Sequence, residues 1–242
     1  MRPAAERDLA SIETWLRLER EQTGEGFYCN WSIIEKGFGA GHLFVLGAQG
    51  DVLGFVLDAP YGPDILEVRP DARGAGRGRQ LAQAAIATAF ERGISVIEID
   101  CAPDTSIPFW QKMGFTVVYG RAGNGGGVYA FKVLERQFKL AADAQTSFGI
   151  SFYSESSWHG PSAKPFRSYA GAAAPLARGV LQLPERAICY TSDIRNLCDC
   201  VVCIVVEGRT VFEGRVKYAE AFGAMRDAGD NYYLEQIRTD AS

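Results

Sequence analysis

The 242-residue sequence lacks several features that mark other classes of protein. Its longest uninterrupted apolar run, Val201 to Val206, is far shorter than the roughly 20 residues that a membrane-spanning helix needs. The first 16 residues carry charges throughout and contain no apolar core, so they do not resemble a secretory signal. We therefore expect a protein that works in the cytoplasm and has no membrane partner.

The sequence also lacks an excess of basic residues. The formal net charge is −4 and the sequence pI is about 5.4. Neither part of the chain is basic when it is divided at residue 136. Because nucleic-acid binding is driven largely by Lys and Arg, the overall charge does not indicate a nucleic-acid partner.

A convincing metal motif is missing as well, although the chain has six cysteines. Cys198 and Cys200 would lie on the same face of a strand, whereas Cys203 would point to the other face. That arrangement is poor for a tetrahedral zinc site. In a chain without an export signal we expect reduced, mostly buried thiols and no metal.

The most informative stretch runs from Ile65 to Arg92. A short β-prone segment ends at Pro70 and is followed by a loop with the sequence Arg73-Gly-Ala-Gly-Arg-Gly78. After the loop, apolar residues recur at spacings of three and four from Leu81 to Phe90. The sequence therefore predicts a strand, a glycine-rich loop and a helix in direct succession.

This arrangement favours binding of a phosphorylated ligand. A helix N-terminus exposes unpaired N–H groups and a partial positive charge, and glycines leave room for an anion. Arginines at 73, 77 and 79 add permanent charge. The Walker A pattern is excluded because Arg79-Gln80 stands where Lys and Ser or Thr are required, and the spacing of the glycines does not fit G-x-G-x-x-G.

The loop fits the pattern Arg-x-x-Gly-x-Gly through Arg73, Gly76 and Gly78. It resembles the diphosphate-binding signature of the GNAT superfamily of acyl-CoA-dependent N-acyltransferases. The segment Ser106 to Phe115 (SIPFWQKMGF) resembles that family's short helix ending in Gly-Phe, and a strand-like run from Ile94 to Ile99 precedes it. The resemblance covers residues 1–136 and does not extend to residues 137–242.

The resemblance implies an α/β (α+β) fold, with a central, mostly antiparallel mixed sheet flanked by helices. Periodicity independently predicts an amphipathic helix within residues 1–23, a hairpin formed by 42–46 and 52–57, and a closing strand pair at 116–119 and 128–133. For residues 137–242 we expect a C-terminal α+β domain, with a strand at 148–153, a hairpin at 200–206 and 210–216, a helix at 218–226 and a last segment at 232–237. We expect this domain to influence the choice of acceptor.

The resemblance also implies an N-acyltransferase that moves an acyl group, by default from acetyl-CoA, to an amine. Positions that match the family's donor site are Val68, Arg73, Gly74, Ala75, Gly76, Arg77, Gly78 and Trp110. Candidate catalytic residues are Asp64, Glu67, Asp100 and Tyr119, of which Asp64 and Glu67 have opposite parity on one strand. Tyr129, Cys101 and Ser106 are further candidates for the general acid.

Two positions depart from the family pattern. Trp110 stands where the family often has a tyrosine that acts as the general acid, and Pro103 stands where an asparagine is usual. An indole N–H cannot act as an acid near neutral pH. Two alternatives therefore stay open: a CoA-binding module without transferase activity, and a GNAT-fold enzyme with a nucleic-acid acceptor. We also leave a homodimer open.

Overall fold

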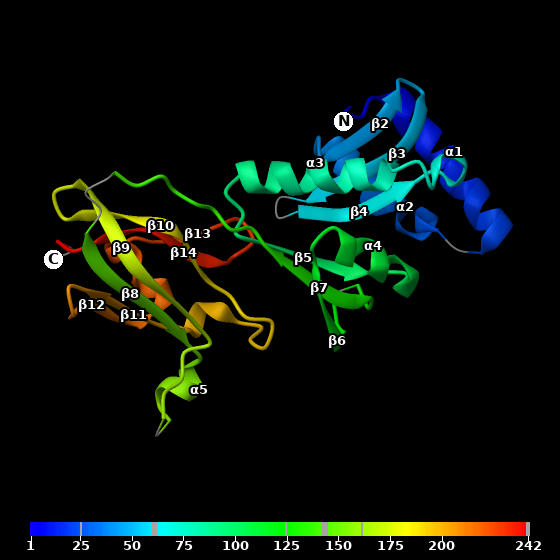
Figure 1. The fold of residues 1–242 in the computed structure, drawn as a ribbon. Coiled ribbons are helices and arrows are strands. Elements are labelled where there is room, and N and C mark those ends of the chain that lie inside the picture. The colour runs from blue at the N-terminus through cyan, green and yellow to red at the C-terminus, as the bar shows by residue number, and fades with distance from the viewer. Residues whose placement is uncertain (25, 60–61, 124, 142–144, 161, 241–242) are drawn as a thin grey trace. The chain divides into compact units, whose positions relative to one another are not determined.

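The computed structural model describes the chain except for residues 25, 60–61, 124, 142–144, 161 and 241–242. It divides into two compact units, one formed by Met1–Gly93 and Ile97–Lys132 and the other by Ile94–Val96 and Val133–Ser242 (Figure 1). The assignment of separate roles to residues 1–136 and 137–242 stays a prediction.

The first unit alternates helices with antiparallel strands. Its elements are β1 (Arg2–Pro3), α1 (Glu6–Thr23), η1 (Phe27–Asn30), α2 (Trp31–Gly39), β2 (Leu43–Ala48), β3 (Asp51–Ala59), β4 (Gly62–Val68), η2 (Pro70–Ala72), α3 (Arg77–Glu91), β5 (Val96–Cys101), η3 (Asp104–Ser106), α4 (Ile107–Lys112), β6 (Thr116–Ala122) and β7 (Val128–Val133). The amphipathic N-terminal helix, the hairpin of β2 and β3 and the closing pair of β6 and β7 confirm the sequence predictions. Residue 124, in the glycine-rich loop of that pair, lies outside the described residues.

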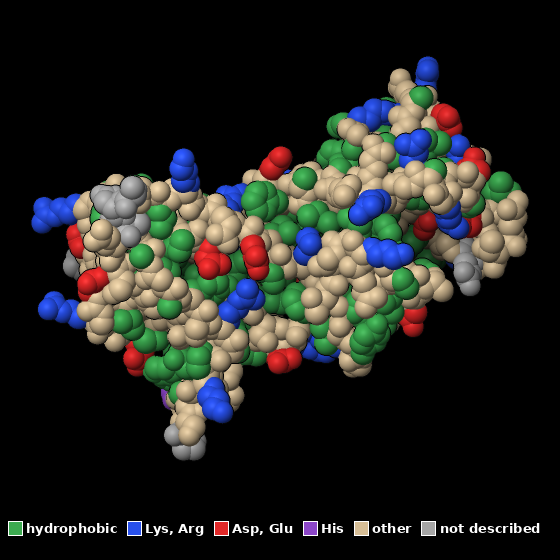
Figure 2. Space-filling view, in the orientation of Figure 1, with side chains coloured by type: hydrophobic (Ala, Val, Ile, Leu, Met, Phe, Trp, Pro, Cys, Tyr) green, Lys and Arg blue, Asp and Glu red, His purple; other side chains and the backbone are tan. Residues whose placement is uncertain are grey.

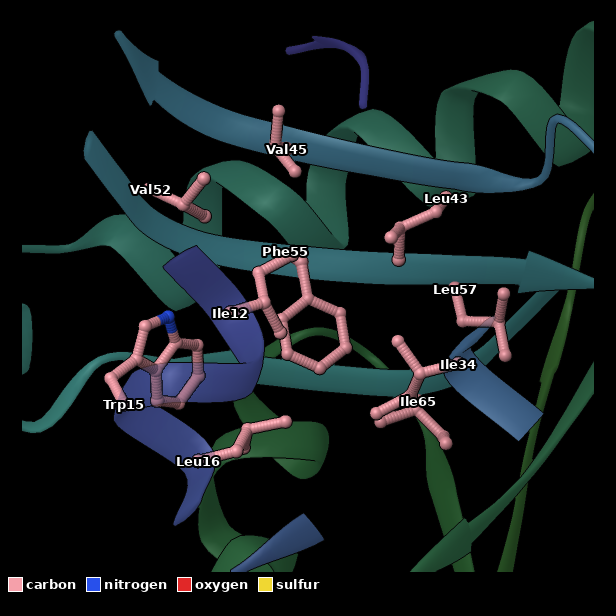
Figure 3. Close-up of a cluster of buried hydrophobic side chains, with 10 residues drawn as sticks. All are labelled: Ile12, Trp15, Leu16, Ile34, Leu43, Val45, Val52, Phe55, Leu57 and Ile65. Carbon is pink, nitrogen blue, oxygen red and sulfur yellow. The ribbon is translucent and has the colours of Figure 1, made fainter. Parts of the chain in front are cut away.

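Helices cover both faces of the sheet β1-β2-β3-β4. On one face, α1 and α2 bury a cluster around Phe55, and Figure 3 shows how its side chains converge from the helices and strands. On the other face, Leu81 and Ala85 of α3 pack against Val56 and Val68. The spacing of apolar residues predicted α1 and α3, because each of these helices has one buried face.

The two sheets of this unit separate at β4 and β5. β4 is the last strand of the four-stranded sheet, and β5 is the first strand of a three-stranded sheet ordered β5-β7-β6. A Cβ atom at Gly62 would lie 2.8 Å from Ile97 Cγ2, so the two strands approach each other closely there. Among the described residues they share no ladder, which leaves one edge of β4 without a strand partner.

Asp8 ties the start of α1 to the sheet. Its carboxylate accepts two hydrogen bonds from the Arg2 guanidinium, at 2.6 and 2.9 Å, and one each from the N–H groups of Ala5 (2.8 Å) and Gly50 (2.9 Å). The residue is fully buried. The hydrogen bonds from Arg2 are the main reason that the pKa of Asp8 lies well below its ordinary value.

The second unit is dominated by a seven-stranded antiparallel sheet ordered β12-β11-β8-β9-β10-β14-β13. Its elements are β8 (Thr146–Tyr153), α5 (Glu155–Trp158), β9 (Arg167–Ala177), β10 (Val180–Cys189), η4 (Leu197–Asp199), β11 (Val201–Val206), β12 (Arg209–Arg215), η5 (Val216–Tyr218), η6 (Glu220–Phe222), β13 (Ala224–Arg226) and β14 (Tyr232–Arg238). The predicted strand at 148–153 and the hairpin of β11 and β12 are confirmed.

The helix predicted at 218–226 is wrong. The segment instead forms two 3₁₀ turns followed by β13, which pairs with β14. Gly223 interrupts it with a φ of +105°, and a Cβ atom there would lie 2.3 Å from the carbonyl oxygen of Gln236. Only glycine fits this backbone and this close approach, so the chain leaves the helical region at that residue.

Surface charge is mixed on the face drawn in Figure 2, where acidic, basic and hydrophobic side chains alternate. Within the described parts of the chain, none of the helices combines the length and apolar character needed to cross a bilayer.

We predict that Asp8→Asn lowers the free energy of unfolding by about 2 kcal/mol at pH 7, because the variant loses charge-assisted hydrogen bonds to Arg2. The pKa of Asp8 is lowered by folding, so its contribution to stability is present above the ordinary value of 3.8 and is lost as pH falls below it. Urea unfolding should therefore show a difference between wild type and variant that shrinks progressively below pH 3.8.

Asp51→Asn is the matched control, because Asp51 pairs with Arg69 at an exposed position of the same unit. It should change the free energy of unfolding by less than about 0.5 kcal/mol. Equal effects of the two substitutions would contradict the role given to Asp8.

Candidate functional site

The glycine-rich loop after β4 adopts a conformation that two of its glycines require. Gly74 and Gly76 have φ values of +79° and +77°, where other residues would be strained. A Cβ atom at either position would meet no atom within 4 Å. The glycines therefore serve the path of the backbone, and the space in front of them is not filled by the protein.

The loop ends at the N-terminus of α3, which lies beside this open space and has no side-chain cap. Gly76 is the N-cap residue and no side chain caps the helix, while the N–H of Gln80 is the first that bonds back, to the carbonyl oxygen of Gly76 at 3.1 Å. The N–H groups of residues 77–79 have no acceptor within the helix, as at any helix start. Arg77 and Arg79 add positive charge, so the geometry suits an anion.

Gly78 has a different role from the other two glycines. A Cβ atom there would lie 3.5 Å from Phe109 and 3.6 Å from Val68, which is ordinary packing distance. The first turn of α3 thus rests against the end of β4 and against α4. Both motifs found in the sequence, Arg73 to Gly78 and Ser106 to Phe115, meet at this point.

Arg73 is held by groups of β4 and α1. Its Nε donates to the carbonyl oxygen of Val68 at 2.9 Å, and its Nη2 donates to Glu19 Oε1 at 2.5 Å and to Glu67 Oε1 at 3.0 Å. The side chain is 47% exposed. In this structure its charge is shared by two carboxylates, so the predicted contact with a donor phosphate would compete with them.

Glu67 lies on β4 with a side chain that is 14% exposed. Its Oε1 accepts hydrogen bonds from Arg73 and from the N–H of Val68, at 3.1 Å. Burial raises the pKa of Glu67, Arg73 opposes that shift, and the negative charge of Glu19 adds to it. Glu67 is therefore a partly buried carboxylate with an elevated affinity for a proton.

The structure brings Asp64 and Asp100 together. On β4, Asp64 and Glu67 have opposite side-chain parity. Partial burial raises the pKa of Asp64, and the nearby Asp100 raises it further. Asp100 is itself held by the N–H of Gly125, and a Cβ atom at Gly123 would clash with its carboxylate. Asp100 therefore has a structural task in fixing the loop between β6 and β7.

The aromatic candidates occupy contrasting positions. Tyr119 is 70% exposed, and Gln111 Nε2 approaches its hydroxyl at 3.4 Å. Trp110 is buried between Phe109 and Phe115, with ring centroids 5.0 and 5.1 Å away. In this structure Trp110 is a core residue of α4, and Tyr119 faces solvent.

The remaining candidate acids are engaged or buried. The hydroxyl of Tyr129 donates to Glu98. Cys101 is buried, which raises the pKa of its thiol. Ser106 Oγ is buried and has no hydrogen-bond partner among the described residues. Among the described residues, no cluster of His, Cys, Asp and Glu has the arrangement of a metal site.

Glu19 was missed by the sequence reasoning. It is 7% exposed and lies on the buried face of α1, one turn after Trp15 and Leu16. A charged residue at the spacing of a buried stripe is the signal that could have identified it, because such a residue needs a partner inside the protein. Leu18, one residue before Glu19 on the same helix, is exposed.

Comparison with known families and structures gives the following matches. Residues 9–115 match the model of the acetyltransferase (GNAT) family. No curated protein matches the sequence.

Three solved structures illustrate the similarity. A GCN5-related N-acetyltransferase from Rhodopseudomonas palustris has 24% identity and a TM-score of 0.45, covering 55% of this chain and 94% of its own. A ribosomal-protein-alanine N-acetyltransferase from Brucella melitensis has 22% identity and a TM-score of 0.43, covering 55% and 98%. A PaiA N-acetyltransferase from Thermoplasma acidophilum in complex with coenzyme A has 16% identity and a TM-score of 0.42, covering 55% and 97%.

We predict that Arg73→Gln destabilises the protein at pH 7, because Glu19 and Glu67 lose their shared cation. Arg73 is nearly half exposed and solvent screens part of the attraction, so we expect a loss of about 2 kcal/mol, below that of a fully buried pair. Without the cation, burial raises the pKa of Glu67 with less opposition. The folded state then binds a proton more readily than the unfolded state, and stability falls as pH rises.

The deficit of Arg73→Gln should therefore be smaller at pH 5 than at pH 7 in chemical denaturation experiments. Arg69→Gln is the control, since Arg69 pairs with the exposed residues Asp51 and Asp71. A deficit that is the same at both pH values would argue against buried, unpaired carboxylates as its cause.

Proposed function

We propose that the protein is an N-acyltransferase that transfers the acetyl group of acetyl-CoA to an amine, because residues 9–115 match the model of the GNAT family of acetyltransferases. The single observation that carries the proposal is the open N-terminus of α3 behind the Gly74 and Gly76 turns. It supplies directed N–H groups, positive charge and unfilled space, which are the requirements for a diphosphate.

The acyl donor, acetyl-CoA, would extend from this anion site along the end of β4. One edge of β4 has no strand partner among the described residues, so its backbone groups can hydrogen-bond to an extended ligand. The N–H of Val68, which the family resemblance directs toward the thioester carbonyl, is hydrogen-bonded to Glu67 Oε1 in this structure. Donor binding would exchange that acceptor for the thioester oxygen.

The reaction requires a base because an amine that arrives as an ammonium ion has no lone pair. We assign the base to Glu67, whose Oε1 already accepts two hydrogen bonds and whose Oε2 would take the proton. The amine nitrogen then attacks the thioester carbonyl carbon and the C–N bond forms. The nitrogen loses its second proton to solvent, and the C–S bond breaks. The electron pair leaves on sulfur, and the resulting thiolate takes a proton, for which Tyr119 and solvent are the candidates.

Several finer points belong to the same proposal. We place the enzyme in the cytoplasm because none of the six cysteines forms a disulfide bond, which suits a reducing compartment. A role for residues 137–242 in choosing the acceptor stays a prediction, as does a homodimer. The net charge of −4 gives no support to a nucleic-acid acceptor.

We predict that Arg77→Glu weakens acetyl-CoA binding about tenfold or more, because it replaces a cation at the α3 N-terminus by an anion. Isothermal titration calorimetry on the full chain measures this directly. Arg178→Glu is the matched control, since it makes the same charge change at an exposed turn of the second unit. Failure of the wild type to bind acetyl-CoA at millimolar concentration would overturn the proposed function.

We predict that Glu67→Gln lowers kcat/KM about 100-fold while donor affinity changes little, because a neutral amide cannot accept the proton. Release of the CoA thiol in the presence of a panel of primary amines measures turnover. Donor binding by the wild type without acyl transfer to any amine would instead favour the non-catalytic CoA-binding module.

A further inference from the structure

Glu19 is a buried carboxylate whose second oxygen has no hydrogen-bond partner within the described part of the chain. Its Oε1 accepts from Arg73 Nη2 at 2.5 Å, whereas its Oε2 is buried and has no hydrogen-bond donor among the described residues. The carboxylate lies against Gly26, where a Cβ atom would be 3.2 Å from Oε2. A half-satisfied buried carboxylate is costly, because its lost hydration is only partly replaced.

Stability alone does not account for an acid at this position. The surrounding face of α1 is apolar, with Ile12, Trp15 and Leu16 in the same core. An apolar side chain of similar size would fill the space without the cost of desolvating a charge, and buried ion pairs are often less stabilising than such replacements. The feature to explain is therefore what Glu19 does to Arg73.

Arg73 is shared between two carboxylates through one atom. Its Nη2 is 2.5 Å from Glu19 Oε1 and 3.0 Å from Glu67 Oε1, so the shorter contact is with Glu19. Two negative groups face one positive group, which leaves the cluster with one net negative charge. The charged form of Glu67 thus receives only part of the electrostatic stabilisation that an arginine paired with Glu67 alone would give.

The other residues next to Glu67 leave its protonation to be set by Glu19 and Arg73. On β3, the residue opposite Glu67 is the neutral Phe55. On β4 itself, Asp64 has the opposite side-chain parity and interacts with the carboxylate of Asp100. The helix α3 packs against the opposite face of β4.

Resting on the proposed function, we propose that Glu19 is a positioning residue that draws Arg73 partly away from Glu67 and so keeps Glu67 basic enough to accept the proton of the acceptor ammonium. A carboxylate paired with an arginine of its own becomes a weak base, and proton transfer from an amine then slows. A residue outside the reacting atoms thereby sets the pH range of the enzyme.

The test is Glu19→Gln, which removes the competing charge but keeps the shape of the side chain. Burial and the charge of Glu19 both raise the pKa of Glu67, so the substitution should lower that pKa. In ¹³C NMR titrations of the glutamate carboxyl groups, with Glu67→Gln for assignment, the Glu67 midpoint should move to lower pH. One pH unit below the wild-type midpoint, the variant should keep about a threefold larger fraction of its plateau kcat/KM.

Two further variants separate this role from a purely structural one. Arg73→Gln should move the Glu67 midpoint to higher pH, opposite to Glu19→Gln, and it keeps the test decisive if Glu19→Gln does not fold. Glu13→Gln removes a carboxylate from the same helix that pairs with Arg17 at 2.6 Å, and it should leave the midpoint unchanged.

The outcomes distinguish this inference from the proposed function. An unmoved Glu67 midpoint in Glu19→Gln, or shifts of equal sign in Glu19→Gln and Arg73→Gln, would overturn the role of Glu19. A shifted midpoint with an unchanged pH profile of kcat/KM would overturn it as well, because Glu67 would then not be the group that limits turnover. Absence of acetyl-CoA binding by the wild type would overturn the proposed function, whereas the NMR titrations need no substrate.

Discussion

The guanidinium group of Arg73 joins three parts of the first unit that are distant in the sequence. It hydrogen-bonds to the carbonyl oxygen of Val68 at the end of β4, to Glu67 on the same strand, and to Glu19 on α1. These contacts fix where the loop leaves the sheet and how the first helix meets it. The position of the α3 N-terminus, and with it the candidate anion site, depends on that departure point.

The position of β4 explains why these groups meet. Its face toward α1 and α2 carries Ile65 in the core around Phe55, and its other face carries Val68 against α3. One edge pairs with β3, and the other edge has no strand partner in the described part of the chain. A strand buried on both faces but open along one edge can present backbone groups to an extended ligand while its side chains hold the two helices in place.

The sequence predicted the elements that depend on local signals. Glycines with positive φ, a proline that ends β4 and apolar spacing in α3 act over a few residues, so the strand, loop and helix could be recognised without a structure. The role of Glu19 depends on Arg73, 54 residues away, and no local pattern contains that contact. The prediction of a helix at 218–226 was wrong because the conformation of this segment also depends on a distant contact. The backbone conformation at Gly223 is set by its close approach to β14.

The arrangement of charge also has a consequence for a donor that carries a diphosphate. Two carboxylates close to the anion site would repel such a ligand if they were unpaired, and the low local dielectric of a partly buried site would strengthen the repulsion. Arg73 compensates one of these two charges on the side of α1. Under the proposed function, Arg77 and Arg79 at the helix start would then act on the ligand. Because Arg73 cannot neutralise two carboxylates completely, the residual negative charge lies on the side from which a cationic amine would approach Glu67. Under the proposed function, Arg73, Glu19 and Glu67 would thus accommodate an anionic donor and favour a cationic acceptor.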